Sequence, residues 1–260
     1  MQESLLQTKL YLPRPMPTWV ERPRLMTRLN DGIDSGARLT LVAAPVGYGK
    51  TSLLASWLAT TAGAVAWLSL DPEDNEPVRF WTYAIAALQT ARPELGQQIL
   101  SLLQAAPNPS LDFVVADLIN EVATSPAQVI LVLDDFHVIE NPAIHRTIEF
   151  LVEHQPSQLH LAILTREDPA LPLAQLRAKG QMVELRGRDL QFSKEEAAEL
   201  LVRRAKLSLS PGGVEALQGR TEGWVAGLQM AALSLQHITD PCGSTRSFRR
   251  NPTATTRYRR

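Results

Sequence analysis

The sequence has little of what a secreted or membrane-spanning protein would need. It holds one cysteine, Cys242, among 260 residues, so no disulfide can form within the chain. No apolar run reaches the roughly 18 residues that a membrane span requires. The first twenty residues carry Glu3 and three prolines instead of a basic start and an apolar block, which is not the pattern of a secretory signal. These absences predict a protein of the reducing cytoplasm without a membrane span.

The sequence also has few residues that would support zinc binding or DNA binding. Five histidines and one cysteine offer no ligand cluster for zinc. The net charge of −1 is unevenly distributed, because residues 237–260 hold six arginines and one acid, a balance of +5 that leaves −6 for residues 1–236. Duplex binders usually display a clustered basic face. The acidic main body therefore argues against specific DNA binding by this chain, and only the tail could bind nucleic acid, without specificity.

What the chain does contain is a regular alternation of short apolar runs and helical periodicity. Strands are predicted at residues 38–43, 64–70, 128–133, 159–164 and 182–185. Apolar spacing between them predicts helices at residues 51–60, 78–90, 95–104, 111–124, 142–154 and 172–178. Strands that alternate with helices are typical of a doubly wound α/β fold. We therefore predict a five-stranded, mainly parallel sheet flanked by helices.

The loop after the first strand carries the chemistry of a nucleotide site. It matches the Walker A pattern at every fixed position but the first, where alanine replaces glycine. Its glycines let backbone N–H groups point at phosphate oxygens, and the helix that follows adds its positive dipole end. Lys50 would reach the β- and γ-phosphates of ATP, and the Thr51 hydroxyl would coordinate Mg²⁺. The residues predicted to bind the nucleotide are Ala44, Pro45, Val46, Gly47, Tyr48, Gly49, Lys50, Thr51 and Ser52.

The alternative for this loop is an ordinary strand-to-helix turn that contains glycine. The run Gly-Lys-Thr-Ser in this context disfavours it.

A second motif follows about eighty residues later, where the apolar strand at 128–133 ends in two aspartates. Asp134 would hold Mg²⁺ through water, and Asp135 would orient or deprotonate the attacking water. The alternative is that the Asp-Asp pair caps the next turn. The presence of the Walker A loop upstream favours the catalytic interpretation.

Three further residues follow the strands. Arg166 comes after the strand at 159–164, whose carboxyl end should face the γ-phosphate, so we predict a sensor role. Pairing of Arg166 with Glu167 or Asp168 on the surface is an equal alternative. His137 and His145 flank the second motif, but lone histidines there are more often packing residues, and neither is assigned a role.

Four segments follow from these patterns. Residues 1–37 form a proline-rich, extended lead-in and a first helix near 24–31, and residues 38–189 form the P-loop nucleotide-binding domain. Helices at 193–206, 211–218 and 224–236 form a small helical domain at 190–236. Residues 237–260 form a basic tail with almost no apolar periodicity, which predicts disorder. Gly223, Trp224 and Gly227 could bring a helix near the nucleotide, although tight helix packing explains them equally well.

With these residues in view, the chain resembles the N-terminal ATPase module of MalT-type transcriptional regulators. These are large bacterial proteins of the signal-transduction ATPase (STAND) group that also carry a LuxR-type DNA-binding domain. The resemblance spans residues 8–236 in order. Its motifs are TKLYLP (8–13), RLTL (38–41), PVGYGKT (45–51), WLSLD (67–71), DN (74–75), LDDFH (133–137), HQP (154–156), LTR (164–166) and GW (223–224).

The resemblance implies a molecular switch. ATP or ADP would lie between the sheet domain and the small helical domain, and exchange or hydrolysis would bias a closed or a self-associating state. In such proteins an inducer binds helical repeats downstream and a helix-turn-helix binds DNA, and this chain contains neither. The pattern is lost abruptly at residue 237, so we hypothesise a truncated or frameshifted product.

The competing function is a self-sufficient P-loop ATPase or kinase. A kinase would need an acceptor pocket and usually a mobile arginine-rich lid, and the sequence indicates neither.

Overall fold

The computed structural model describes residues 5–61, 63–105 and 109–239. Its strands are β1 (Leu39–Ala43), β2 (Ala64–Ser69), β3 (Val129–Asp134), β4 (Leu159–Thr165) and β5 (Met182–Arg186). They form one sheet in the order β2-β3-β4-β1-β5, in which every neighbouring pair runs parallel. The predicted α/β fold is confirmed, and every strand boundary lies within one residue of its predicted position.

Helices connect the strands. They are α1 (Pro23–Asp34), α2 (Lys50–Leu58), α3 (Pro77–Ala91), α4 (Gln97–Ala105), α5 (Leu111–Ala123), α6 (Pro142–His154), α7 (Leu173–Ala178) and the short α8 (Gly187–Leu190). The 3₁₀ helices η1 (Gln7–Leu10), η2 (Pro72–Asn75) and η3 (Phe136–Val138) lie between longer elements. The helices α1 to α7 occur where the sequence predicts them. The short α8, η1, η2 and η3 were not predicted, because three or four residues carry too little periodicity.

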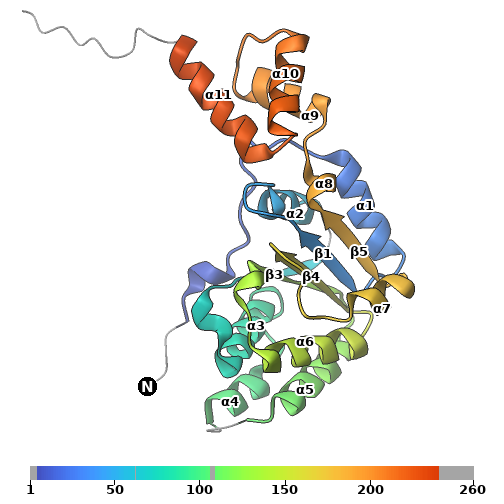
Figure 1. Ribbon diagram of the computed structural model, residues 1–260. Coiled ribbons are helices and arrows are strands. Elements are labelled where there is room, and N and C mark those ends of the chain that lie inside the picture. Colours follow the sequence, from blue (N-terminus) through green and yellow to red (C-terminus); the bar gives the residue numbers. More distant parts are fainter. Residues whose placement is uncertain (1–4, 62, 106–108, 240–260) are drawn as a thin grey trace, which may run out of the picture.

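Two apolar layers hold the sheet between its helices (Figure 1). Strand β1 shows the division, because Leu39 and Leu41 belong to the cluster of α3, α5 and α6, whereas Val42 belongs to the cluster of α1 and α2. Every residue of β1, β3 and β4 is buried, as expected for central strands covered on both faces. The carboxyl ends of β1, β3 and β4 therefore lie side by side at one edge of the sheet.

Beyond α8 the chain forms a helical unit, defined here as α9 (Lys194–Ala198), η4 (Glu199–Arg204), α10 (Pro211–Thr221) and α11 (Val225–Thr239). It lies at the end of the molecule that carries the start of α2, and it has an apolar cluster of its own. One regular helix was predicted over 193–206, but η4 is a π-helical turn. The wider turn buries the consecutive residues Leu200 and Leu201 together. Helix α11 continues to Thr239, past its predicted end at 236.

The lead-in, residues 5–22, connects the β2 edge of the sheet to the helical unit. Near its start, Lys9 is ion-paired with Asp71 (2.9 Å between Nζ and Oδ2) and with the fully buried Asp74. At its end, the buried Arg22 is ion-paired with Glu196 of α9, at 3.3 Å between Nη2 and Oε2. The lead-in is thus bound to both parts of the molecule. Residues 240–260 of the predicted basic tail lie outside the described residues.

Candidate functional site

The predicted Walker A loop lies where β1 ends and α2 begins. Gly47 and Gly49 adopt left-handed backbone conformations, with φ of 81° and 78°, which glycine reaches without steric cost. Ala44 is buried, and its amide donates to the carbonyl of Thr165 on β4 (3.2 Å). Lys50 is the first residue of α2. The strand, curled loop and helix N-terminus have the arrangement of an anion-binding P-loop.

Lys50 is buried, with 8% of its surface exposed. Its Nζ donates to the carbonyls of Ala44 (2.8 Å) and Pro45 (3.2 Å), so the side chain folds back along its own loop. Burial lowers the pKa of Lys50, while the carboxylates of Asp135 and Asp134 raise it. The cation is therefore held within the loop, close to both predicted carboxylates.

Thr51 and Asp134, the two predicted metal ligands, are in contact although 83 residues separate them. The Thr51 hydroxyl donates to Asp134, at 3.0 Å between Oγ1 and Oδ2. Asp134 ends β3 and is buried, at 5% exposure. Burial, followed by the charge of Asp135, raises the pKa of Asp134 to about 6.

Asp135, the predicted base, has an unusual backbone for a residue with a side chain. Its φ of 56° lies in the left-handed region, which aspartate enters more readily than most residues but at a steric cost. Its amide donates to Asp134 (2.9 Å to Oδ1), and its carboxylate makes no capping hydrogen bond to η3. The Asp135 side chain is about half exposed. It is therefore accessible at the carboxyl edge of the sheet.

His137, to which the sequence motifs assign no role, lies beside Asp135. Its Nδ1 lies 3.8 Å from Oδ1 of Asp135, and this nitrogen is buried without a hydrogen-bond partner among the described residues. Burial, and then the nearby Arg166 cation, lowers the pKa of His137, so the imidazole stays neutral. Only its position two residues after Asp135 could have indicated this placement. The 3₁₀ turn η3 brings it back toward the carboxylate.

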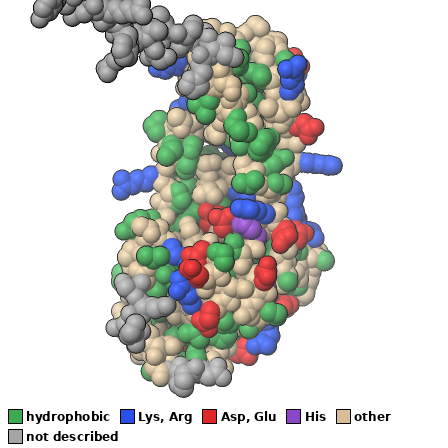
Figure 2. All heavy atoms as spheres, turned by 60° about the vertical axis from the view of Figure 1, so that its left-hand side comes forward, with side chains coloured by type: hydrophobic (Ala, Val, Ile, Leu, Met, Phe, Trp, Pro, Cys, Tyr) green, Lys and Arg blue, Asp and Glu red, His purple; other side chains and the backbone are tan. Residues whose placement is uncertain are grey.

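Arg166 follows β4 at the same edge. The Arg166 charge lowers the pKa of both Lys50 and His137. Arg166 therefore lies near these two residues, at the carboxyl edge of the sheet. Asp168, one of its alternative partners, is ion-paired with Arg186 instead. Within the described residues, Arg166 makes no ion pair with Glu167 or Asp168. Figure 2 shows acidic and basic side chains gathered on one face of the α/β part, with a histidine among them.

The donor set at this edge suits Mg²⁺ bound to a triphosphate. In the described residues, no group of three or more histidine, cysteine or acidic side chains could hold a metal ion by itself. Mg²⁺ usually binds one or two protein oxygens together with phosphate oxygens and waters. The Thr51 hydroxyl and the Asp134 carboxylate, 3.0 Å apart, fit that requirement.

The helical unit contacts the P-loop directly. The indole Nε1 of Trp224 donates to the carbonyl of Val46 (3.2 Å), and the amide of Ala226 donates to the carbonyl of Gly47 (3.0 Å). The sequence left open whether this segment approaches the nucleotide site or serves helix packing. The structure places it against the predicted site.

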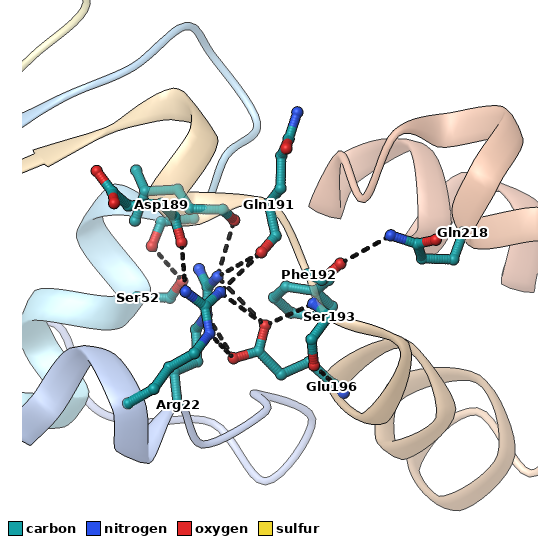
Figure 3. A network of polar contacts seen from close by, with 11 residues as sticks. Arg22, Ser52, Asp189, Gln191, Phe192, Ser193, Glu196 and Gln218 are labelled. Carbon is teal, nitrogen blue, oxygen red and sulfur yellow. Dashed lines mark hydrogen bonds and ion pairs between the residues drawn. The ribbon is translucent and has the colours of Figure 1, made fainter. Parts of the chain in front are cut away.

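A small cavity lies beside the loop, between the lead-in, α2 and the helical unit. Its volume is about 30 Å³, and its lining includes Val20, Ser52, Phe192 and Val225. Next to it, Arg22 donates to the carbonyls of Leu190 and Gln191 and to Glu196 (Figure 3). Its Nη1 is buried without a hydrogen-bond partner in the described part of the chain.

The fold and this loop define a protein of the P-loop nucleoside triphosphatase class. A Walker-type ATPase of Pyrococcus abyssi superposes with a TM-score of 0.57 at 14% identity, over 88% of this chain and 71% of that chain. Cdc6p from Pyrobaculum aerophilum superposes with a TM-score of 0.53 at 17% identity, over 88% of this chain and 65% of that chain. These identities show the shared fold alone. No protein-family profile matches the chain.

Sequence similarity to curated proteins identifies a narrower group within the P-loop nucleoside triphosphatase class. The chain is 38% identical over 230 residues to the HTH-type transcriptional regulator MalT of Yersinia enterocolitica, and 36% identical over 235 residues to that of Cronobacter sakazakii. These matches cover 88% and 90% of this chain, so the predicted resemblance to MalT-type regulators is confirmed. The chain spans about a quarter of the length of these relatives, 25% and 26%. None of its described helices could cross a membrane.

Proposed function

We propose that the chain binds ATP or ADP with Mg²⁺, hydrolyses ATP slowly, and uses the nucleotide as a regulatory switch. The observation that carries the proposal is the convergence of Lys50, Thr51 and Asp134 at one loop. The Thr51 hydroxyl donates to Asp134 (3.0 Å), and the Asp134 charge acts on the pKa of Lys50. A buried cation, a hydroxyl and a carboxylate at a helix N-terminus are the groups that hold a Mg²⁺ triphosphate.

The phosphates would bind the backbone of the curled loop. The amides from Gly47 to Thr51 and the N-terminus of α2 supply donors and a positive dipole end. Lys50 would exchange its bonds to the Ala44 and Pro45 carbonyls for bonds to phosphate oxygens. Mg²⁺, when bound, neutralises charge on the β- and γ-phosphates.

Hydrolysis would use Asp135 to orient or deprotonate water. The capping alternative has little support, because neither carboxylate caps η3: Asp134 accepts from Thr51 and from the Asp135 amide instead. We assign His137 a positioning role, because its buried Nδ1 faces Asp135 at 3.8 Å. Arg166 would sense the γ-phosphate from the end of β4.

The base of the nucleotide would enter the small cavity beside the loop. The unpartnered Arg22 Nη1 is a donor for a ring nitrogen, and Phe192 and Val225 offer apolar contact. A volume of about 30 Å³ holds roughly one or two waters, so the lead-in has to move outward to admit a base.

The proposed switch also concerns the full-length MalT-type regulators that this chain resembles. We propose that nucleotide exchange changes the docking of the small helical domain (190–236) on the nucleotide-binding domain (38–189), and that the ATP state favours self-association. Inducer and DNA binding would belong to regions of MalT-type regulators that this chain does not resemble. We also propose a cytoplasmic location, because the similar proteins are transcriptional regulators.

Single-turnover hydrolysis tests the proposal. Asp135→Asn should lower the hydrolysis rate at least about 100-fold, the usual contribution of a general base, while ATP affinity changes little. Asp31→Asn, an exposed carboxylate on α1, is the matched control and should hydrolyse ATP at the wild-type rate. Hydrolysis by Asp135→Asn at the wild-type rate would remove Asp135 from the mechanism.

The same assay separates a switch from a self-sufficient enzyme. A switch should turn over slowly in steady state. Steady turnover faster than roughly a few per minute would favour the alternative of an autonomous ATPase or kinase.

A further inference from the structure

We propose that Trp224 and the Ala226 amide act as positioning groups that hold the P-loop in its phosphate-binding shape and couple the helical unit to the bound nucleotide. The inference rests on the proposed nucleotide site and adds the contact through which that site and the helical unit influence each other. Its basis is a pair of hydrogen bonds from the start of α11 to two successive carbonyls of the loop.

Trans peptide geometry makes these two bonds informative. In a trans peptide the carbonyl of one residue and the N–H of the next point in opposite directions. The Trp224 indole donates a hydrogen bond to the carbonyl of Val46 (3.2 Å), so this carbonyl points toward the helical unit. The Gly47 N–H must therefore point away from it. The Ala226 amide holds the carbonyl of Gly47 (3.0 Å) and thereby sets the direction of the Tyr48 N–H. Both N–H groups belong to the set that would bind phosphate.

Close packing makes the contact specific. A Cβ on Gly47 would lie 2.7 Å from the Ala226 Cβ and 2.8 Å from the Trp224 Nε1. A Cβ on Gly227 would lie 2.7 Å from the Trp224 ring. The indole therefore needs glycine on both sides, one in the loop and one in α11. This requirement accounts for the small residues around Trp224 more fully than helix packing alone.

The segment that carries Trp224 is itself anchored in the helical unit. Gly223 has φ of 69°, and its carbonyl accepts from the Phe192 amide (2.9 Å). Val225, between the two residues that contact the loop, and Leu228, two residues after Ala226, are buried in the apolar cluster of the unit. A shift of the loop carbonyls would therefore be transmitted to the core of the helical unit.

Coupling of this kind is reciprocal. If the docked helical unit favours the phosphate-binding loop, bound nucleotide must favour the docked unit by the same factor. Nucleotide should therefore protect the Ala226 amide from exchange, because that amide is free to exchange only when the contact opens.

Two measurements on the full chain test the inference. Trp224→Phe keeps an aromatic ring and removes the indole N–H. It should weaken ADP binding about threefold to tenfold, the loss expected for one hydrogen bond. Leu233→Ala, on the exposed side of the same helix, is the control and should bind ADP as the wild type does. In the wild type, ADP should slow hydrogen exchange at the Ala226 amide, a change that a merely structural contact would not show.

The outcomes separate this inference from the proposed function. If ADP binds the wild type but neither Trp224→Phe affinity nor Ala226 exchange changes, the coupling is wrong and the nucleotide site stands. If the wild type does not bind ADP or ATP, both are wrong.

Discussion

Lys50 and Asp134 are buried charged groups. Their surroundings shift the pKa of each residue in the direction that favours its neutral form. Burial lowers the pKa of Lys50, and burial with the charge of Asp135 raises the pKa of Asp134 to about 6. Buried ionisable groups with perturbed pKa values are common at functional sites, because they match the protonation state to a ligand or a reaction at a cost in folding stability. The contact between Thr51 and Asp134, across 83 residues of sequence, brings the two motifs of the candidate site together.

His160 is a buried titratable residue outside this site. Its Nδ1 and Nε2 lie 2.9 Å from the Ala37 carbonyl and 2.8 Å from the Thr40 hydroxyl, and the residue lines a cavity of about 770 Å³ at the opposite edge of the sheet. Burial lowers its pKa from 6.5 to about 4. Between those values the unfolded chain binds a proton that the folded protein does not, so stability falls as the pH drops from 6.5 toward 4.

Removing this titration should reduce the acid sensitivity of the fold. We expect acidification from pH 7 to pH 5 to cost the wild type about 2 kcal/mol more unfolding free energy than His160→Gln, measured by urea unfolding at both pH values. Glutamine can hydrogen-bond but does not titrate. Equal losses in the two proteins would show that the fold does not lower the pKa of His160, because all other titrating groups are common to both.

At the residue scale, the sequence predicted the candidate site residues that belong to motifs and missed those whose place depends on the tertiary fold. Lys50, Thr51 and Asp134 stand at fixed positions of known patterns, and the parallel sheet brings them together as expected. His137 and Arg22 have no such pattern. His137 acquires its place from the turn η3, and Arg22 from the docking of the lead-in on α9, neither of which leaves a periodic signal.

Among the elements, the glycine turn between α10 and α11 positions the contact with the P-loop. Gly223 has φ of 69°, and a Cβ there would lie 2.6 Å from the Phe192 carbonyl oxygen and 2.9 Å from the Phe192 amide nitrogen. Both atoms are backbone, so neither can move aside easily. Gly219, within α10, has open space around it and ordinary helical φ.

The two glycines should respond oppositely to alanine. Gly223→Ala should lower the free energy of unfolding by about 2 kcal/mol or more, through backbone strain and the clash with Phe192. Gly219→Ala should raise it by about 0.5 to 1 kcal/mol, because alanine loses less backbone entropy in a helix. Urea unfolding measures both. A Gly223→Ala protein as stable as the wild type would mean that the turn relaxes at no cost.

Strands were predicted at the right positions where a single physical feature, burial on both faces of the sheet, determined their composition. The strands β1, β3 and β4 are short apolar runs buried on both faces, so their positions were clear from the sequence. The element η4 was predicted as part of a regular helix, because Leu200 and Leu201 fit the apolar spacing of an α-helix almost as well as that of a π-helical turn. A π-helical turn changes the backbone pitch without changing composition, and no sequence period distinguishes it over six residues.

For the whole molecule, the end of the lead-in and the start of α1 hold the helical unit against the α/β part. Arg22 and Arg24 both pair with Glu196 of α9, at 3.3 Å and 3.0 Å, and both donate to the carbonyl of Gln191. The Arg22 and Glu196 side chains are almost fully buried. Neither the order of the strands nor this long-range docking can be read from local sequence patterns, because both depend on contacts between distant segments.

Removing the shared carboxylate should loosen this attachment. Glu196→Gln should reduce the free energy of unfolding by about 3 kcal/mol, because it leaves a buried arginine without its counter-ion. It should also expose the chain near residues 187–193 to limited proteolysis. Glu195→Gln, an exposed neighbour in the same turn, should leave both properties nearly unchanged. Wild-type resistance in Glu196→Gln would show that the lead-in does not hold the unit in place.

The nucleotide site itself is tested most directly by calorimetric titration of ADP and of Mg²⁺ with ATP into the full chain and its Lys50→Ala variant. The wild type should bind both nucleotides, and Lys50→Ala should bind at least about 100-fold more weakly, because it loses a charge-assisted contact to phosphate at a buried position. Lys179→Ala, an exposed lysine after α7, should bind as the wild type does. Equal affinities of the wild type and Lys50→Ala would contradict the assignment of this loop as the phosphate site.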